Sequence, residues 1–202
     1  EILAGATMAF VAGYWGCETL RTPVIGFYGC DMVYSPSGQT HFYGKGSPDP
    51  LREHISLRSL EAKAMRLFCW ALKRHILLVN CSRSETSHLV FPRVPLSRLG
   101  ELPPPGRQWQ ALIARARHLF EEERQPPYDA YRRDVLDGPE TARCLEIIDR
   151  MDRQWLALIP MMNDILDAHG VAGNSDRPGH VGEATTTPSE VISCLMSTTT
   201  KP

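Results

Sequence analysis

Val24-Ile25-Gly26-Phe27-Tyr28-Gly29-Cys30-Asp31 is the stretch of the chain that decides its fold class. A short apolar run closed by Gly29 and followed by a carboxylate predicts a buried parallel strand over residues 24–30, with Asp31 at its C-terminal edge. In open α/β sheets, ligands bind at that edge. Residues 33–55 are rich in Pro, Gly and polar groups and predict a loop beside it. We therefore favour a sugar or nucleotide site here, and the alternative is a strand followed by an ordinary surface loop.

A helix and a second strand are predicted to follow this loop. Ser56 is a suitable N-cap for a helix over residues 56–74, whose apolar positions form one stripe, and residues 76–81 form a second apolar run that ends in polar groups. Strand, helix and strand at this spacing predict a βαβ unit with adjacent or near-adjacent parallel strands and a right-handed crossover. The fold class expected is α/β, a Rossmann-like three-layer parallel sheet that forms a partial domain.

Helices are predicted on both sides of this unit. Met8, Val11, Ala12 and Trp15 recur at helical spacing and predict a helix over residues 4–16 that stops at Gly16. Downstream, one helix is predicted around Trp109. Another starts at Asp137-Gly138-Pro139 and is kinked or divided at Pro160. Trp109, Trp155 and the Met161-Met162 pair are expected to pack on the α/β core rather than to form a partner surface. The expected regions are the partial Rossmann-like domain 1–100, a Pro-rich linker 101–107, a helical appendage 108–168 and a disordered tail 169–202.

Composition narrows the classes of function. The chain has 202 residues, 43% of them apolar and 22% charged, with a net charge of -1. It has no long basic stretch, so we do not expect a nucleic-acid partner. No apolar run reaches the roughly 18 residues of a membrane-spanning helix, so we expect no transmembrane segment. The six cysteines are widely spaced without a C-x-x-C pair, which indicates a reducing, cytoplasmic location, with peripheral membrane association left open. Because the chain enters a helix pattern almost at Glu1, we expect the C-terminal part of a longer domain.

The residues that can carry chemistry gather in and beside the predicted loop. None of the seven histidines has a metal-ligand spacing, so no metal is expected. His54 precedes a predicted helix and is either a general base near neutral pH or a solvated loop residue. Tyr34 and Tyr43 can donate hydrogen bonds to a phosphate, or they can simply cover the edge of the core. His41 lies between them and is a candidate substrate-binding residue.

Several short motifs in this order resemble a known family. Leu3-Ala4-Gly5 opens a helix, Gly29-Cys30-Asp31 closes a strand, and His54 precedes the helix that contains Glu61-Ala62. Leu78-Val79-Asn80-Cys81-Ser82 and Leu89-Val90-Phe91-Pro92 come after them. The order resembles the bacterial sialyltransferases of glycosyltransferase family 42, and also a related uncharacterised group similar to a 6-hydroxymethylpterin pyrophosphokinase. The resemblance covers about residues 1 to 100.

The resemblance implies a role for each matching residue. His54 would be the general base that deprotonates the acceptor hydroxyl, and Tyr34 and Tyr43 would bind the leaving phosphate. Gly29 and Asp31 would line the nucleotide-sugar site. The family has a serine that touches the nucleotide where this chain has Ala4, so Ala4-Gly5 would approach the nucleotide without that hydroxyl.

A nucleotide-sugar-dependent glycosyltransferase of surface polysaccharide or glycan synthesis is thus the first hypothesis. Its partners would be a donor, with CMP-linked sugars as candidates, and a glycan acceptor, and it would need no other cofactor. The first rival is a pterin diphosphokinase-like phosphoryl transferase, which would need Mg²⁺ and for which Asp31 and Asp49 are the candidate ligands. The second is a non-catalytic remnant or an interaction module built on helices 108–168.

Overall fold

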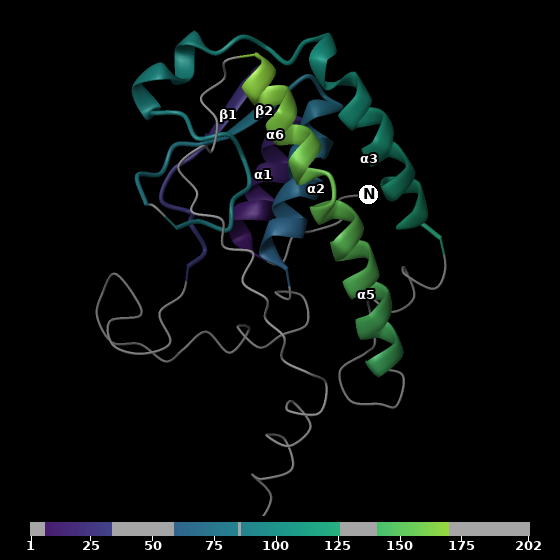
Figure 1. Cartoon of the computed structure of the whole chain (residues 1–202). Helices are drawn as coiled ribbons and strands as arrows, with labels where there is room; N and C mark the ends of the chain where they lie inside the picture. Colours follow the sequence, from purple (N-terminus) through teal and green to yellow (C-terminus); the bar gives the residue numbers. More distant parts are fainter. Residues whose placement is uncertain (1–6, 34–58, 85, 126–140, 170–202) are drawn as a thin grey trace, which may run out of the picture.

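The structure is a computed structural model that describes residues 7–33, 59–84, 86–125 and 141–169 (Figure 1). Within these ranges it contains two parallel strands, five α-helices and two short 3-10 helices. In chain order the elements are α1 (Met8–Thr19), β1 (Val24–Phe27), α2 (Leu60–Leu72), β2 (Leu77–Asn80), η3 (Leu96–Glu101), η4 (Arg107–Trp109), α3 (Gln110–Glu122), α5 (Thr141–Leu156) and α6 (Ile159–Ala168).

The predicted strand–helix–strand unit is confirmed as an α/β arrangement. Strands β1 and β2 pair in parallel with Val24 opposite Leu77 and Phe27 opposite Asn80. On the other side of β2, Arg93 forms a parallel bridge with Asn80, so the extended segment around it continues the edge of the sheet. Strand β1 ends at Phe27, three residues before the predicted end, because Gly29 has a φ of +69° and the chain turns there.

Helix α2 begins at Leu60, and Ser59 caps it. The Ser59 hydroxyl accepts a hydrogen bond of 3.2 Å from the backbone N–H of Ala62. The prediction of Ser56 as the cap was therefore wrong, although both serines satisfy the same N-cap pattern. Helix α2 is buried on nearly all sides because it contacts α1, β2, α3 and α5.

Helix α1 differs from its prediction in its end and in its buried face. It continues through Gly16 to Thr19, because the carbonyl of Gly16 accepts a hydrogen bond from Leu20. Three of the four residues whose spacing predicted the helix lie on its outer side: Ala12 is exposed, as are Met8 by 79% and Trp15 by 57%. The helix is apolar nearly all round, so hydropathy alone does not decide which face packs. The close approach of Leu67 and Phe27 to Gly13 shows which face packs against the core. The buried residues of that face are Phe10, Gly13, Tyr14, Gly16 and Cys17.

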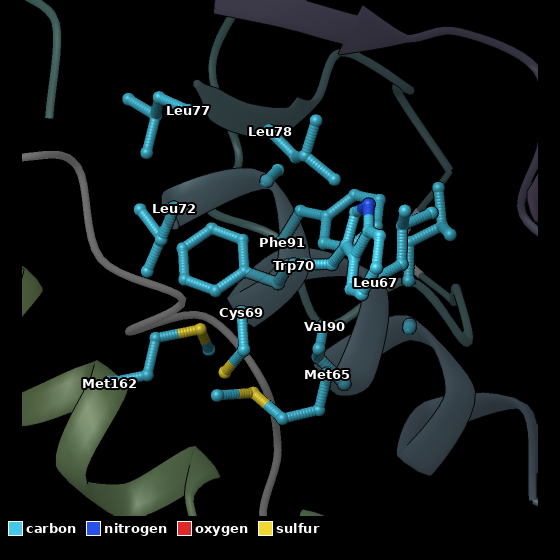
Figure 2. Packing of buried hydrophobic residues seen from close by; sticks show 14 of the residues in the cluster. Met65, Leu67, Cys69, Trp70, Leu72, Leu77, Leu78, Val90, Phe91 and Met162 are labelled. Carbon is cyan, nitrogen blue, oxygen red and sulfur yellow. The ribbon is translucent and has the colours of Figure 1, made fainter. Parts of the chain in front are cut away.

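The C-terminal helices share one hydrophobic core with the α/β unit. Trp109 and Trp155 are buried, as expected, and belong to the same cluster as the residues of β2 and α2. In Figure 2, Met162 of α6 points toward Cys69 and Met65 of α2. The predicted division of the last helix is confirmed, because α5 ends at Leu156 and α6 begins at Ile159 with a proline in its first turn. The predicted start at residues 137–139 lies outside the described residues, as does the predicted tail from 170 onward.

Four polar side chains form a network inside this core. The Arg66 Nε lies 2.9 Å and 2.7 Å from the two carboxylate oxygens of Glu123, and Arg66 Nη1 donates to the Tyr14 hydroxyl at 2.6 Å. The Trp155 indole N–H donates to Glu123 at 2.7 Å. The network joins α1, α2, the end of α3 and α5.

None of the helices in the described ranges is long and apolar enough to cross a membrane.

We predict that Gly13→Ala lowers the free energy of unfolding by about 1–3 kcal/mol, the usual cost of overpacking a core. A Cβ atom at position 13 would lie 2.7 Å from a methyl carbon of Leu67 and 2.9 Å from the ring of Phe27, both of which are buried. Urea unfolding measures the change. Gly100→Ala is the matched control, since a Cβ there meets open space. Equal stability of the two variants would contradict this packing of α1.

We also predict an alkaline loss of stability that depends on Tyr14. Burial raises the pKa of Tyr14 from 10.0 to about 12. The folded protein therefore holds this proton more tightly than the unfolded chain does. The resulting stabilisation is complete below pH 10 and is lost as the pH rises toward 12, by up to about 3 kcal/mol. In urea unfolding series, Tyr14→Phe should lose less stability than wild type over this range, and Tyr28→Phe should follow wild type. Parallel curves for all three proteins would contradict the prediction.

Candidate functional site

The structure describes two of the predicted site residues, Gly29 and Asp31, and both lie at the carboxyl edge of the sheet. The other predicted site residues lie outside the described residues, so their roles stay predictions. They are Ala4, Gly5, Tyr34, His41, Tyr43 and His54.

Asp31 is joined to the end of the neighbouring strand. Gly29 and Met32 both have positive φ, +69° and +57°, so the chain turns sharply on either side of Asp31. One carboxylate oxygen of Asp31 accepts a hydrogen bond of 2.6 Å from the Ser82 hydroxyl, just after β2. The other oxygen, Oδ1, is buried and has no hydrogen-bond partner in the described part of the chain. A buried acceptor without a donor is costly, so a donor from outside the described residues, a bound water or a ligand group, would stabilise this atom.

Asn80 fixes the shape of the loop that carries Ser82. Its side chain is fully buried, accepts from the Ser82 backbone N–H at 2.9 Å and donates to the Ser87 hydroxyl at 3.1 Å. The Ser82 hydroxyl in turn accepts from the backbone N–H of Ser84 at 3.2 Å. The sequence predicted a polar end for β2, and the structure shows that Asn80 organises it.

A histidine–carboxylate pair lies at the same edge, and sequence reasoning did not find it. His88 Nδ1 lies 2.5 Å from a carboxylate oxygen of Glu61, in the first turn of α2, and both side chains are partly exposed. The backbone N–H of His88 donates to the Asp31 carbonyl at 2.9 Å. A carboxylate beside an imidazole orients the ring, and a positioned imidazole is a candidate group for proton transfer. Its two members are 27 positions apart, and no local spacing signals them.

A pocket of about 620 Å³ opens where the ends of β1 and β2 meet the segment 93–97. Its lining includes Tyr28, Ser82, Arg83, Arg93 and Ser97. The guanidinium of Arg93 donates to the carbonyl of Ser84, which holds it at the wall. Arginines and hydroxyl groups around one space can bind an anion, because guanidinium groups form bidentate charge-assisted hydrogen bonds with phosphate.

The cysteines at this edge do not supply a ready nucleophile. Burial raises the pKa of the Cys30 thiol, and the neighbouring charge of Asp31 raises it further. Burial also raises the pKa of the Cys81 thiol, which lines the pocket. Since the thiolate is the reactive form, both groups are held in the unreactive state near neutral pH.

No group of three or more His, Cys, Asp or Glu side chains that could hold a metal ion occurs in the described part of the chain. Comparisons with protein-family models, with curated proteins and with solved structures gave no match for this chain.

We predict that Asn80→Ala destabilises the protein by about 1–3 kcal/mol and loosens the loop after β2, because it leaves buried polar groups without their partner. Urea unfolding measures the first effect, and faster hydrogen exchange of the Ser82 amide measures the second. Thr86→Ala, at an exposed position in the same loop, is the control and should change neither quantity. Unchanged exchange in Asn80→Ala would show that Asn80 does not order this loop.

Proposed function

We propose that this chain belongs to a nucleotide-sugar-dependent glycosyltransferase, similar to sialyltransferases, that acts in the synthesis of surface polysaccharide or other glycans. In this proposal the two parallel strands are part of a Rossmann-like three-layer sheet in a cytoplasmic enzyme. The observation that carries the proposal is the hydrogen bond between Ser82 and Asp31, which joins the carboxyl ends of two parallel strands into one polar edge. Such edges are the ligand sites of open α/β sheets.

The chemistry of Asp31 supports a ligand rich in hydroxyl groups. Its Oδ1 atom is buried without a donor, and a sugar or ribose hydroxyl would supply one. In dinucleotide-binding sheets, an acidic side chain binds a ribose hydroxyl in a comparable way. The role that the resemblance implies for Asp31, lining the donor site, agrees with this chemistry.

The proposed reaction is a direct displacement at the sugar. The acceptor oxygen attacks the anomeric carbon while the bond between that carbon and the phosphate oxygen breaks, and the nucleotide leaves with the bonding electrons. His54 takes the proton of the acceptor hydroxyl, and the hydroxyls of Tyr34 and Tyr43 donate hydrogen bonds to the departing phosphate. These three roles come from the resemblance.

We predict that His54→Ala lowers turnover by about 10²–10⁴-fold and leaves donor affinity unchanged, since a positioned base contributes that much to the rate. The experiment incubates the protein with a panel of nucleotide sugars and glycan acceptors. It measures acceptor-dependent nucleotide release and, separately, donor binding by calorimetry. Unchanged turnover would remove His54 from the mechanism.

Asp31→Asn tests the donor site in the same assay. It should weaken donor binding about tenfold or more, because it removes a charge-assisted acceptor. Asp167→Asn, at an exposed position near the end of α6, is the matched control and should bind like wild type. We expect this chain alone to be inactive or nearly so, and the assays therefore use the full-length protein that contains it. If that protein binds no nucleotide sugar, the proposed function is wrong.

A further inference from the structure

We propose that the pocket at the ends of β1 and β2 is the acceptor site, and that the acceptor is an acidic sugar whose carboxylate pairs with Arg83. The role as acceptor rests on the proposed function, whereas the affinity for an acidic sugar rests on the pocket alone. The proposed function leaves the acceptor as a glycan of unstated chemistry, and the pocket narrows it to a glycan that carries a carboxylate.

The position of the pocket beside the proposed donor site is the first argument. Asp31, which would line the donor site, is not among the residues that line the pocket. Ser82 connects the two places, because it lines the pocket and its hydroxyl donates a hydrogen bond of 2.6 Å to Asp31. A direct displacement needs two neighbouring subsites, since the donor and the acceptor must be held next to each other. The pocket supplies the space beside the donor in which an acceptor would lie.

The lining of the pocket suits a sugar ring. Tyr28 and Leu96 line it and are 62% and 56% exposed, so a ligand can reach both side chains. Ser82 and Ser97 also line it, and serine hydroxyls can exchange hydrogen bonds with sugar hydroxyls. A sugar ring has apolar C–H faces and polar edges, which match an aromatic and apolar wall with a few polar groups. The volume of about 620 Å³ lies within the range of small-molecule sites.

The charge of the pocket selects an acidic sugar over a neutral one. None of its described lining residues is acidic, whereas two of them are arginines. The guanidinium of Arg93 donates to the Ser84 carbonyl, so we assign it to the wall and give it no contact with the ligand. Arg83 is exposed, and its guanidinium has no hydrogen bond or ion pair with a described residue. Because a guanidinium can donate two parallel hydrogen bonds to one carboxylate, an acidic sugar gains a contact at Arg83 that a neutral sugar lacks.

A carboxylate matches this site better than a phosphate group does. Arg83 supplies one positive charge, which one carboxylate balances, whereas a phosphate monoester carries close to two negative charges at neutral pH. The carboxylate of Asp31 lies just beyond Ser82 and repels a doubly charged ligand more strongly than a singly charged one.

NMR titration of the full-length protein tests the proposal with two matched probes, methyl β-glucuronide and methyl β-glucoside, which differ only in a carboxylate against a hydroxymethyl group. We expect the glucuronide to bind about fivefold more tightly at low salt, the effect of an ion pair with an exposed arginine. The preference should shrink at high salt, because ions screen exposed charges. Arg83→Gln should abolish the preference and leave the affinity for the glucoside unchanged, so glucoside binding also shows that the variant is folded.

Two further variants complete the experiment. Tyr28→Ala should weaken the binding of both probes by a similar factor, because it removes part of the wall and no charge. Arg98→Gln is the matched control, since this arginine lies on η3, pairs with Glu101 and does not line the pocket. It should bind both probes as wild type does. Loss of the preference in Arg98→Gln would show that overall charge, and not a site at Arg83, attracts the glucuronide.

The outcomes separate this inference from the proposed function. Equal binding of the two probes, an unchanged preference in Arg83→Gln, or no binding of either probe would overturn the acidic-sugar site. Donor binding that depends on Asp31 would still support the glycosyltransferase in each of these cases. If the glucuronide binds through Arg83 but the full-length protein binds no nucleotide sugar, the acidic-sugar site stands, and the proposed function falls together with the role as acceptor.

Discussion

The buried ion pair between Arg66 and Glu123 is the interaction on which the packing of the helices depends. Arg66 lies in the middle of α2, the central helix of the core, where a charge without a partner would cost several kcal/mol. The Glu123 carboxylate, at the end of α3, pairs with the Arg66 guanidinium. Tyr14 of α1 accepts a hydrogen bond from Arg66, and Trp155 of α5 donates one to Glu123. A hydrophobic surface alone would tolerate sliding of one helix over another. The ion pair and the hydrogen bonds from Tyr14 and Trp155 form only at short distances, so this network favours one register of the surrounding helices on α2.

This constraint extends from the core to the edge of the sheet. Because α2 is held in place, its first turn lies at a set position relative to the ends of the strands. Glu61 in that turn contacts the imidazole of His88. The backbone N–H of His88 donates a hydrogen bond to the Asp31 carbonyl, and the Ser82 hydroxyl donates one to the Asp31 carboxylate. These contacts hold the loop after β2 against the first turn of α2 and against the segment that follows β1. Sites whose side chains are held by such supporting contacts lose less on binding a ligand than sites on free loops do.

The sequence predicted the features that depend on local pattern. The two parallel strands, the helix between them and the division near Pro160 follow from apolar runs and from proline chemistry, and all are present. The buried face of α1 was not predictable from hydropathy, because close packing at Gly13 decides it. At the site, Asp31 and the polar end of β2 were recognised. The pair of Glu61 and His88 was not, because it joins positions that are distant in the chain and close only after folding.

The groups at the edge also bear on the type of reaction. The Cys30 and Cys81 thiols are held protonated near neutral pH, so neither is a ready nucleophile. The Ser82 hydroxyl donates a hydrogen bond to Asp31 and accepts one from the backbone N–H of Ser84, so it helps to hold the loop. What the described edge offers is a carboxylate acceptor on one side and fixed positive charge on the other. Such a combination would suit the proposed direct displacement, which requires an oriented ligand and stabilisation of the departing anion in addition to a base.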